Sequence, residues 1–465
     1  MSEQEVIITT GMRFMAQKLA TTSRNCFRIE PSTSPSGIQS GQITSVSLPE
    51  SSTLDLHSVR CVFTATTTQI VANPGTSAVV AKLPAAYGLV SRVEVFCNGI
   101  QIDGGCTEHN TVQYALATLH DTPISNVSRD NVLKGAFMVP DFVPFDEKTL
   151  TLTADNLSGF FCGSTRYVDV SMLGSIQIRI TWADNSVLSL QGDTGANGQG
   201  ALGDALTANE QQKVDNFGLA NIKYTIDNLA FYCDSLSFSP MYQDMLRTRI
   251  MEAPLPLAFK TYYTFTTQNS HAVVGGGTPG LSNNQQFSIA SQSLDKVYTL
   301  MRDDNYNVGG KVPTQLPTSL FLGGVVPYFF TFRSYDDQTG ADQNKDGLAR
   351  YQLQYNSVPY PTFRAPKSHY IFNTFYGKDR LMTPFGNNIT SMPSFDKGKA
   401  IFTTIFDLPD TGVELESGSD SRGVSSNISF HATGQRCTRS VNMFSIAECT
   451  STCLIGAGRA ISVRF

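Results

Sequence analysis

Hydrophobic and polar residues alternate with a period of two along much of the chain. In the stretch SIQIRITWADN, Ile176, Ile178 and Ile180 are separated by polar residues, and the segments 57–68 and 460–465 repeat the pattern. Side chains that alternate in this way belong to strands with one buried and one wetter face. Many such runs are separated by turns rich in Gly, Pro, Asn and Asp, so the pattern predicts antiparallel β-sandwiches.

Two segments show helical spacing instead. Apolar residues recur every three or four positions in TEHNTVQYALATLH (107–120) and in SPMYQDMLRTRI (239–250), which begins with a candidate serine N-cap followed by proline. The second segment lies near the middle of the chain, between strand-like runs. We therefore expect a first β domain at 26–238 and a second at 239–465 that opens with a short linking helix.

A Gly-rich segment interrupts the strand pattern of the first domain. Residues 190–212, LQGDTGANGQGALGDALTANEQQ, consist largely of Gly, Ala and small polar residues, and GGGTPGLSNNQQ (275–286) is a shorter counterpart. Long segments without strand or helix pattern in compact domains are usually functional or mobile loops. We expect residues 190–212 to form an exposed surface loop.

Composition and charge exclude several classes of protein. Charged residues make up 16% of the 465 residues, the formal net charge is -5, and no run of Lys or Arg is long enough to neutralise a row of phosphates. Direct sequence-specific binding of nucleic acid is therefore not expected. The first residues lack the basic and apolar regions of a secretory signal. The longest apolar stretch, 320–332, is shorter than the roughly 20 residues of a membrane-spanning helix, so the sequence predicts a soluble chain.

The nine cysteines favour a reducing compartment. Their number is odd, they are scattered, and several fall inside strand-like runs. We interpret them as reduced, buried thiols in a chain made in the cytosol or nucleus. Cys449 and Cys453 in CTSTC could hold a metal or form a disulfide, but no histidine lies at the usual spacing for a metal site, and two core or turn thiols are favoured.

Candidate catalytic and metal sites are scarce. DQNKDG (342–347) has the spacing of the start of a calcium loop, but Leu353 occupies the position of the bidentate glutamate, which favours a tight turn. The six histidines are dispersed, and GGG at 275–277 lacks the lysine of a phosphate-binding loop. We assign no catalytic residue, no cofactor site and no metal site.

The segment ARYQLQYNSVPYPTFRAPKSHYIFNTF (349–375) resembles part of a known family. It is similar to the strand, proline turn and helix-like segment in the second half of double jelly-roll major capsid proteins from polinton-like viruses, virophages and nucleocytoplasmic large DNA viruses. Four further segments resemble other parts of these proteins in the same order. They are LVSRVEVFCNGIQID (89–103), YTIDNLAFYCDSLSFSPMYQDML (224–246), residues 405–434 with their late "DL…SG…S" stretch, and the closing GRAISVRF.

The resemblance implies an all-β fold of two consecutive antiparallel eight-stranded jelly rolls with a few short helices and long loops. It also implies a function: a homotrimeric, pseudo-hexagonal capsomer that tiles an icosahedral virus shell. The implied partners are further copies of the chain, penton and minor capsid proteins, and an inner membrane. The implied location is the virion, after assembly in host cytoplasm or nucleus. No enzymatic activity and no cofactor are implied.

The same resemblance assigns roles to short segments. The apolar side of the strand at 351–356, with Tyr351, Leu353 and Tyr355, is expected to pack in a sandwich core. Its polar side, Gln352, Gln354 and Asn356, is expected to face a neighbouring strand, a subunit or solvent. Pro359 and Pro361 are expected to end strand pairing, because proline cannot donate a hydrogen bond to the ladder.

The first 25 residues are expected to form an N-terminal arm. The segment 9–25 contains basic residues and no acid, together with apolar side chains. The resemblance places such arms on the inner side of the shell, which makes Arg13, Phe14, Lys18 and Arg24 candidate interaction residues. The alternative is an ordinary surface segment.

Two other function classes stay open at this point. A β-rich viral fibre or receptor-binding protein would need internal repeats or a trimeric shaft pattern, and the sequence shows neither. A β-sandwich hydrolase or lectin would need a convergent site, such as an acid pair or a triad.

Overall fold

The structure is a computed structural model of the whole chain, and the account below concerns the residues that it describes. These are 23–50, 53–68, 79–104, 106–120, 147–163, 166–192, 221–238, 240–269, 282–303, 329–330, 332, 348–365, 401–406, 418–422, 427–434 and 441–465.

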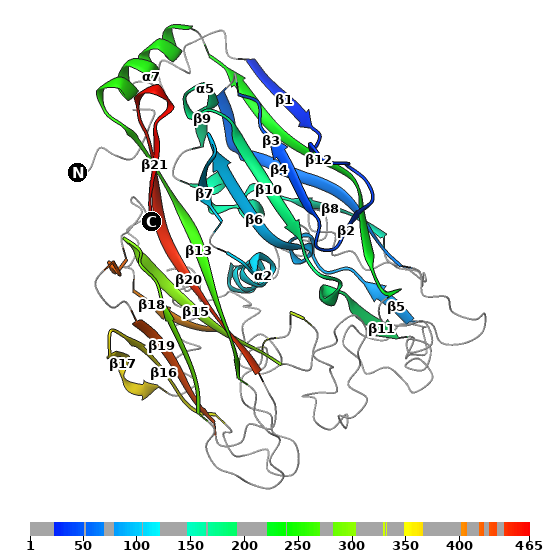
Figure 1. Ribbon diagram of the computed structural model, residues 1–465, viewed down its shortest axis with the longest axis vertical. Helices are drawn as coiled ribbons and strands as arrows, with labels where there is room; N and C mark the ends of the chain where they lie inside the picture. Colours follow the sequence, from blue (N-terminus) through cyan, green and yellow to red (C-terminus); the bar gives the residue numbers. More distant parts are fainter. Residues whose placement is uncertain are drawn as a thin grey trace, which may run out of the picture.

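The first half of the chain forms two main antiparallel sheets (Figure 1). Sheet I has the strand order β1-β12-β4-β8 and sheet II the order β3-β10-β6-β7. Two short strands, β5 and β11, form a separate pair. The bounds are β1 Ser23–Ile29, β2 Ile38–Gln39, β3 Ile43–Ser47, β4 Thr53–Thr67, β5 Val79–Lys82, β6 Val90–Cys97, β7 Ile100–Asp103, β8 Glu147–Leu152, β9 Tyr167–Asp169, β10 Ile176–Trp182, β11 Ser189–Gly192 and β12 Tyr224–Ser237.

The second half forms two further sheets. Sheet III has the order β13-β20-β15-β18 and sheet IV the order β14-β19-β16-β17. In the described residues no strand of one half pairs with a strand of the other half. The bounds are β13 Leu255–Asn269, β14 Ser282–Ser288, β15 Leu294–Asp303, β16 Leu348–Tyr355, β17 Val358–Ala365, β18 Ile401–Ile405, β19 Asn427–Gly434, β20 Val441–Ile455 and β21 Ile461–Arg464.

Both halves have the same topology. The strand orders given above for sheets I and II contain eight strands. Numbered 1 to 8 in chain order, these strands have the order 1-8-3-6 in sheet I and 2-7-4-5 in sheet II. The eight strands of sheets III and IV give the same two orders. Eight antiparallel strands in two facing sheets with these long crossovers make a jelly roll. The chain therefore folds as two consecutive jelly rolls, as the family resemblance implied, and the antiparallel sandwiches predicted from the alternation are confirmed.

The two jelly rolls also share a tight turn between their fourth and fifth strands. Asn98 and Gly99 join β6 to β7 with φ values of 50° and 80°, and Asn356 and Ser357 join β16 to β17 with 49° and 68°. Positive φ at both central residues is the type I′ hairpin turn, which matches the twist of the flanking strands.

This second hairpin corrects one prediction. Pro359 and Pro361 do not end pairing, because both lie inside β17, and Pro359 is opposite Gln354 of β16. In the described residues β17 pairs only with β16, so it lies at the edge of sheet IV, where a missing N–H can face away from the ladder. Leu353 is fully buried and Tyr355 packs against the core, as expected.

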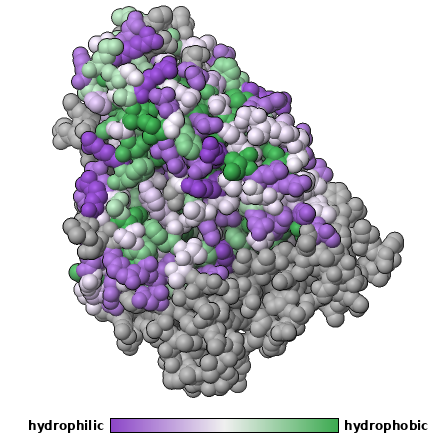
Figure 2. Space-filling view, in the orientation of Figure 1, coloured by the Kyte–Doolittle hydropathy of each residue, from purple (hydrophilic) through white to green (hydrophobic). Residues whose placement is uncertain are grey.

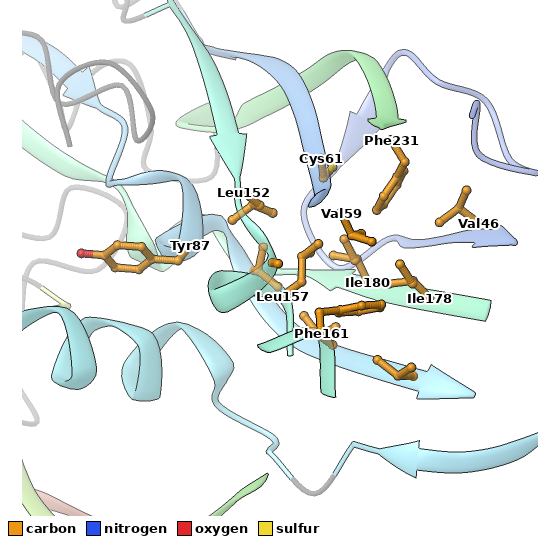
Figure 3. Close-up of a cluster of buried hydrophobic side chains, with 14 of the residues drawn as sticks. Val46, Val59, Cys61, Tyr87, Leu152, Leu157, Phe161, Ile178, Ile180 and Phe231 are labelled. Atoms are coloured by element: carbon orange, nitrogen blue, oxygen red, sulfur yellow. The ribbon is translucent and has the colours of Figure 1, made fainter. Parts of the chain in front are cut away.

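The core of the first jelly roll lies between sheets I and II (Figure 3). Val59, Cys61 and Phe63 of β4 alternate with partly buried residues and belong to the same core cluster as Ile178 and Ile180 of β10. The strict alternation explains why the sequence predicted these strands, since every second residue of each strand enters the same apolar layer.

Helices are few and lie mainly between strands. The predicted helices are α2, His109–His120, and α7, Pro240–Glu252, which links the two jelly rolls. Short helical segments are α4 (Ala154–Leu157), α5 (Val170–Leu173), η2 (Ala86–Leu89), η3 (Gly159–Cys162), η4 (Asn185–Val187) and η8 (Ala457–Arg459). On α7, Ile250 enters the core whereas Met241 and Met251 are exposed.

Several predictions fall outside the described residues. Residues 193–212 of the Gly-rich segment are among them, and its first residues belong to β11 instead. The turn expected at 342–347 and most of 275–286 also lie outside, although 282–286 belong to β14. The arm was expected to end at residue 25, but β1 begins at Ser23. The other domain limits stay predictions.

Candidate assembly interfaces

The first candidate interface joins the two jelly rolls within one chain. Figure 1 shows α2 between sheet II and the long strands β13 and β20. Val112 and Ala115 of α2 are buried against one face of sheet III, which we call its outer face because it points away from sheet IV. The sheet III residues in this cluster are Tyr298, Leu300, Ile401, Phe444 and Ile446. Contact between jelly rolls is thus made by an apolar helix face on an apolar sheet face.

Aromatic rings extend this contact. Tyr114 of α2 stacks on Phe330, with ring centroids 5.0 Å apart, and Phe332 joins the same cluster. Phe330 and Phe332 belong to the longest apolar stretch of the sequence, which is too short to span a membrane. The described part of this stretch fills the joint between the jelly rolls.

A buried arginine lies at the edge of this contact. The guanidinium carbon of Arg302 is 4.0 Å from the ring centre of Phe329 and 4.3 Å from that of Phe444. Its Nη2 is 3.6 Å from Oε2 of Glu108, just before α2. Cation–π contacts and an ion pair therefore hold this charge between the two jelly rolls.

Polar residues form a seam beside the apolar contact. Asp103, at the end of β7, accepts hydrogen bonds from the hydroxyls of Ser158 and of Thr261, the latter at 2.9 Å and from the second jelly roll. Burial raises the pKa of Asp103. At η3 the approach is so close that a Cβ on Gly159 would lie 1.8 Å from the carbonyl oxygen of Lys260.

Lys260 is the centre of a second polar cluster. Its Nζ is 2.7 Å from Oδ2 of Asp295, which is fully buried, and 3.9 Å from Oε1 of Glu448. Tyr298 donates a hydrogen bond to Glu448 at 2.7 Å, and Thr450 donates one to Asp295 at the same distance. Buried acids in such positions need these partners, so the cluster fixes the register of β13, β15 and β20.

His109 at the start of α2 is buried and has a structural role. Its Nε2 lies 2.6 Å from the carbonyl oxygen of Asn156, the geometry of an N–H donated to that oxygen. Burial lowers the pKa of His109 to about 4. The side chain is therefore neutral at physiological pH and ties α2 to α4.

The second candidate interface is the outer face of sheet I, which points away from sheet II. Arg60 lies over the ring of Tyr232 at 5.5 Å, and the register of β4 and β12 places the two residues side by side. Arg166 donates hydrogen bonds of 2.9 to 3.1 Å to both carboxylate oxygens of Asp55. The arginines are exposed by 39% and 53%, while the Asp55 side chain is only 4% exposed.

Of the four predicted arm residues, the structure describes only Arg24. Arg13, Phe14 and Lys18 lie outside the described residues. Arg24 lies in β1 rather than in an arm, and it forms an ion pair with Asp234 of β12 on the outer face of sheet I. This pairing raises the pKa of Arg24. The sequence pattern could not show this contact, because the two residues are 210 positions apart.

Other candidate sites have ordinary structural roles. Cys449 and Cys453 are free thiols within β20, and burial raises the pKa of both. Six of the eight cysteines described are buried, but Cys26 and Cys162 are exposed, contrary to expectation.

Among the residues that the structure covers, no cluster of three or more His, Cys, Asp or Glu could hold a metal ion. Within the same residues, no helix has both the length and the apolar character needed to cross a membrane.

Sequence reasoning missed the joint itself. The spacing of Val112 and Ala115 predicted a helix, but no signal in the sequence named the sheet that covers it. The buried acids Asp103, Asp295 and Glu448 gave a weak signal, because each interrupts or ends a strand-like run. Their partners come from distant strands and only the fold reveals them.

Paired jelly rolls with this topology define a class, the double jelly-roll proteins. Solved structures of this class match almost the whole chain. A crystal structure of PBCV-1 VP54, fitted into a reconstruction of the virophage Sputnik, matches with a TM-score of 0.57 and 11% identity, over 96% of this chain and 97% of that one.

Two further structures extend the likeness. The Faustovirus major capsid protein gives a TM-score of 0.51 and 14% identity, over 94% of this chain and 91% of that chain. The cryo-EM structure of the Sputnik virophage gives a TM-score of 0.52 and 12% identity, over 96% of this chain and 89% of that chain. No protein-family profile and no curated protein sequence matches the chain. The likeness therefore lies in the fold.

Proposed function

We propose that the chain is a major capsid protein that assembles as a homotrimer, forming a pseudo-hexagonal capsomer of an icosahedral virus shell. The observation that carries this proposal is the repeated strand order of the two jelly rolls, together with a fold likeness that extends over nearly the full length of viral capsid structures. The role is structural and needs no cofactor and no catalytic group. Two jelly rolls per chain supply six in a trimer, which approximates a hexagon.

Oligomeric state and particle shape test this proposal. Light scattering coupled to size exclusion is expected to give a trimer that persists on dilution, because obligate contacts bury about 2,000 Å² or more. Negative-stain micrographs are expected to show pseudo-hexagonal particles. A stable monomer with native circular dichroism would contradict the proposal and favour a binding module, such as a receptor-binding protein.

We further propose that the residues before β1 lie on the inner side of the shell. Arg13, Phe14 and Lys18 supply basic and apolar side chains that suit minor capsid proteins or an inner membrane. Penton proteins and neighbouring capsomers are the other expected partners, in a virion assembled in host cytoplasm or nucleus. Deleting residues 1–22, which leaves β1 intact, should preserve trimers and impair shell assembly. A normal yield of particles would contradict this role.

A further inference from the structure

Lys260 of β13 and Asp295 of β15 approach each other across the central strand of sheet III. In the strand order of this sheet β20 lies between β13 and β15, and it carries Glu448 and Thr450 (Figure 1). Nζ of Lys260 is 2.7 Å from Oδ2 of Asp295 and 3.9 Å from Oε1 of Glu448. A primary amine therefore lies beside the carboxyl group of a side chain that is fully buried.

The other oxygen of this carboxyl group has its own donors. Oδ1 of Asp295 accepts a hydrogen bond of 2.7 Å from the hydroxyl of Ser293 and one of 3.2 Å from the backbone N–H of Gly418, which is also 2.7 Å from the Ser293 oxygen. Gly418 can come this close because it has no side chain, since a Cβ there would lie 2.7 Å from Oδ1. Fixed donors on a carboxyl oxygen stabilise the negative charge that forms when a nucleophile adds to the carbon.

Thr450 connects the amine to the carboxyl group. Its hydroxyl accepts a hydrogen bond from Nζ of Lys260 at 2.9 Å and donates one to Oδ2 of Asp295 at 2.7 Å. A hydroxyl that accepts from one group and donates to the other can relay a proton between them. Glu448 is held beside the amine by a hydrogen bond of 2.7 Å from the Tyr298 hydroxyl. Its negative charge can therefore stabilise a positive charge on the nitrogen.

We infer that Lys260 and Asp295 form an isopeptide bond, a covalent amide between Nζ and Cγ, within the folded chain. The inference goes beyond the proposed capsid function and does not depend on it. The reaction needs no cofactor and no co-reactant, because both reactants are side chains of one sheet and the only by-product is water. It occurs once in each chain, so it is a self-modification and does not make the protein an enzyme.

The bond forms by addition and elimination at Cγ of Asp295. One proton passes from the ammonium group of Lys260 to Oδ2 across their hydrogen bond, which leaves an amine and a carboxylic acid. The nitrogen lone pair attacks Cγ, and the π electrons of the C=O bond move to Oδ1, where Ser293 and Gly418 stabilise the charge. A second proton moves from the nitrogen through Thr450 to Oδ2. The C–O bond then breaks with its electron pair on Oδ2, and water leaves as the C=O bond re-forms.

Two physical effects favour the amide over the separate side chains. The fold holds the amine and the carboxyl group in contact, and the effective molarity of such oriented pairs reaches about 10⁵ to 10⁸ M. The bond also converts a positive and a negative charge into a neutral amide, which removes the desolvation cost of the buried Asp295 carboxylate. Burial of Asp295 also restricts the access of water that could hydrolyse the product.

The position of the bond gives it a mechanical role. β13 is the first strand after the linking helix α7, and at Lys260 its backbone lies against Gly159 of the first jelly roll. The bond ties β13 to β15 with β20 enclosed between them. Hydrogen-bonded strands can open locally, whereas a covalent link keeps β13 in sheet III when the joint between the jelly rolls is pulled.

Mass spectrometry of the denatured full-length chain tests the inference. The purified wild type is expected to be lighter than its sequence by the mass of one water molecule, and a digest should contain a branched peptide that joins Lys260 to Asp295. A chain without this loss of mass would overturn the inference. A loss of water without a branch, as in a succinimide at Asp295, or a branch that ends at Glu448, would also overturn it. The capsid proposal is tested separately by the oligomeric state and stands in each of these cases.

Three variants test the roles of single residues, with circular dichroism to confirm that each is folded. Lys260→Arg keeps the positive charge without the amine nucleophile and should retain the full mass of its sequence. Lys296→Arg, the same change at a lysine of β15, is the matched control and should keep the branched peptide. Loss of the branch in this control would overturn the assignment to Lys260.

Ser293→Ala removes one donor to Oδ1 of Asp295. The linked fraction of this variant, measured at intervals during cell-free synthesis, should rise about 100-fold more slowly than that of the wild type. An unchanged rate in the folded variant would overturn the proposed stabilisation of the charge on Oδ1.

Discussion

The outer faces of sheets I and III have the same place in two jelly rolls of identical topology, yet their chemistry is opposite. On sheet III the residues Tyr298, Leu300 and Phe444 are almost fully buried under α2. On sheet I, Arg60, Val62 and Tyr232 are partly exposed. The backbone pattern is the same, but in the described residues α2 covers the outer face of sheet III, whereas these residues of sheet I stay partly exposed. Position in a fold therefore does not by itself determine the polarity of a sheet face.

Figure 2 shows how hydrophilic and hydrophobic residues are distributed over one face of the molecule. Its described residues form a mosaic of hydrophilic and hydrophobic patches rather than one continuous apolar zone. In the described residues, most of the large hydrophobic side chains that are exposed belong to edge strands or the linking helix, as with Phe27, Ile43 and Met251. Scattered apolar residues of this kind are normal on a soluble surface.

The largest expected effect contrasts the same change on the two faces. Leu300→Asp places a charge without a partner in the apolar joint, and we expect a loss of more than about 4 kcal/mol of stability, enough to prevent folding. Val62→Asp on sheet I should cost about 1 kcal/mol in the fold of the single chain. Circular dichroism and soluble yield measure both. Equal damage from the two substitutions would remove the contrast between the faces.

The joint should also be sensitive to acid through His109. Above about pH 6.5 the histidine is neutral in both the folded and unfolded states, so its protonation does not change the free energy of unfolding. Between pH 6.5 and the folded pKa of about 4 only the unfolded state gains a proton, so stability falls as the pH falls, by up to about 3 kcal/mol.

Denaturant unfolding of the wild type and of His109→Gln, at several pH values between 7 and 4, measures this loss. Glutamine can still donate a hydrogen bond towards Asn156 but does not titrate in this range. The difference in unfolding free energy between the two proteins should shrink or change sign towards pH 4. A constant difference would show that His109 does not become protonated on unfolding.

A smaller effect is expected on the outer face of sheet I. Arg166→Ala removes the bidentate partner of Asp55 and leaves a buried carboxylate with poorer hydrogen bonding. Because Arg166 is half-exposed and water can enter in its place, we expect a loss of about 1 to 2 kcal/mol rather than the larger cost of a broken buried pair. Arg422→Ala, which breaks a pair in which both side chains are exposed, is the control and should leave stability almost unchanged, because solvent screens the pair.

The smallest effect concerns the equivalent turns. Ser357 has φ of 68°, where glycine is free of the steric cost that other residues bear, whereas the first jelly roll already has Gly99 at this position. Ser357→Gly should stabilise the second hairpin by about 0.5 to 1 kcal/mol, and Gly99→Ser should destabilise the first by about 1 kcal/mol. Thermal unfolding measures both, and the same sign for the two changes would contradict the equivalence of the turns.

The sequence alone determined the class of fold and the position of its main elements. Alternation in β4 and β10, and the helical spacing of α2 and α7, appear in the structure as predicted, because these patterns reflect local geometry and burial on one side. The proline hairpin was misread. A proline can stay within an edge strand, and sequence does not say which strands are edges.

Only the tertiary structure decided which surfaces meet. Arg24 and Asp234, or Asp103 and Thr261, are brought together by crossovers between distant strands, and no local pattern encodes such pairs. The partner of α2 was hidden for the same reason: an apolar helix face shows that something covers it, without saying what. The repeated 1-8-3-6 order became visible only when all strands were paired, because topology depends on long-range hydrogen bonds rather than on local periodicity.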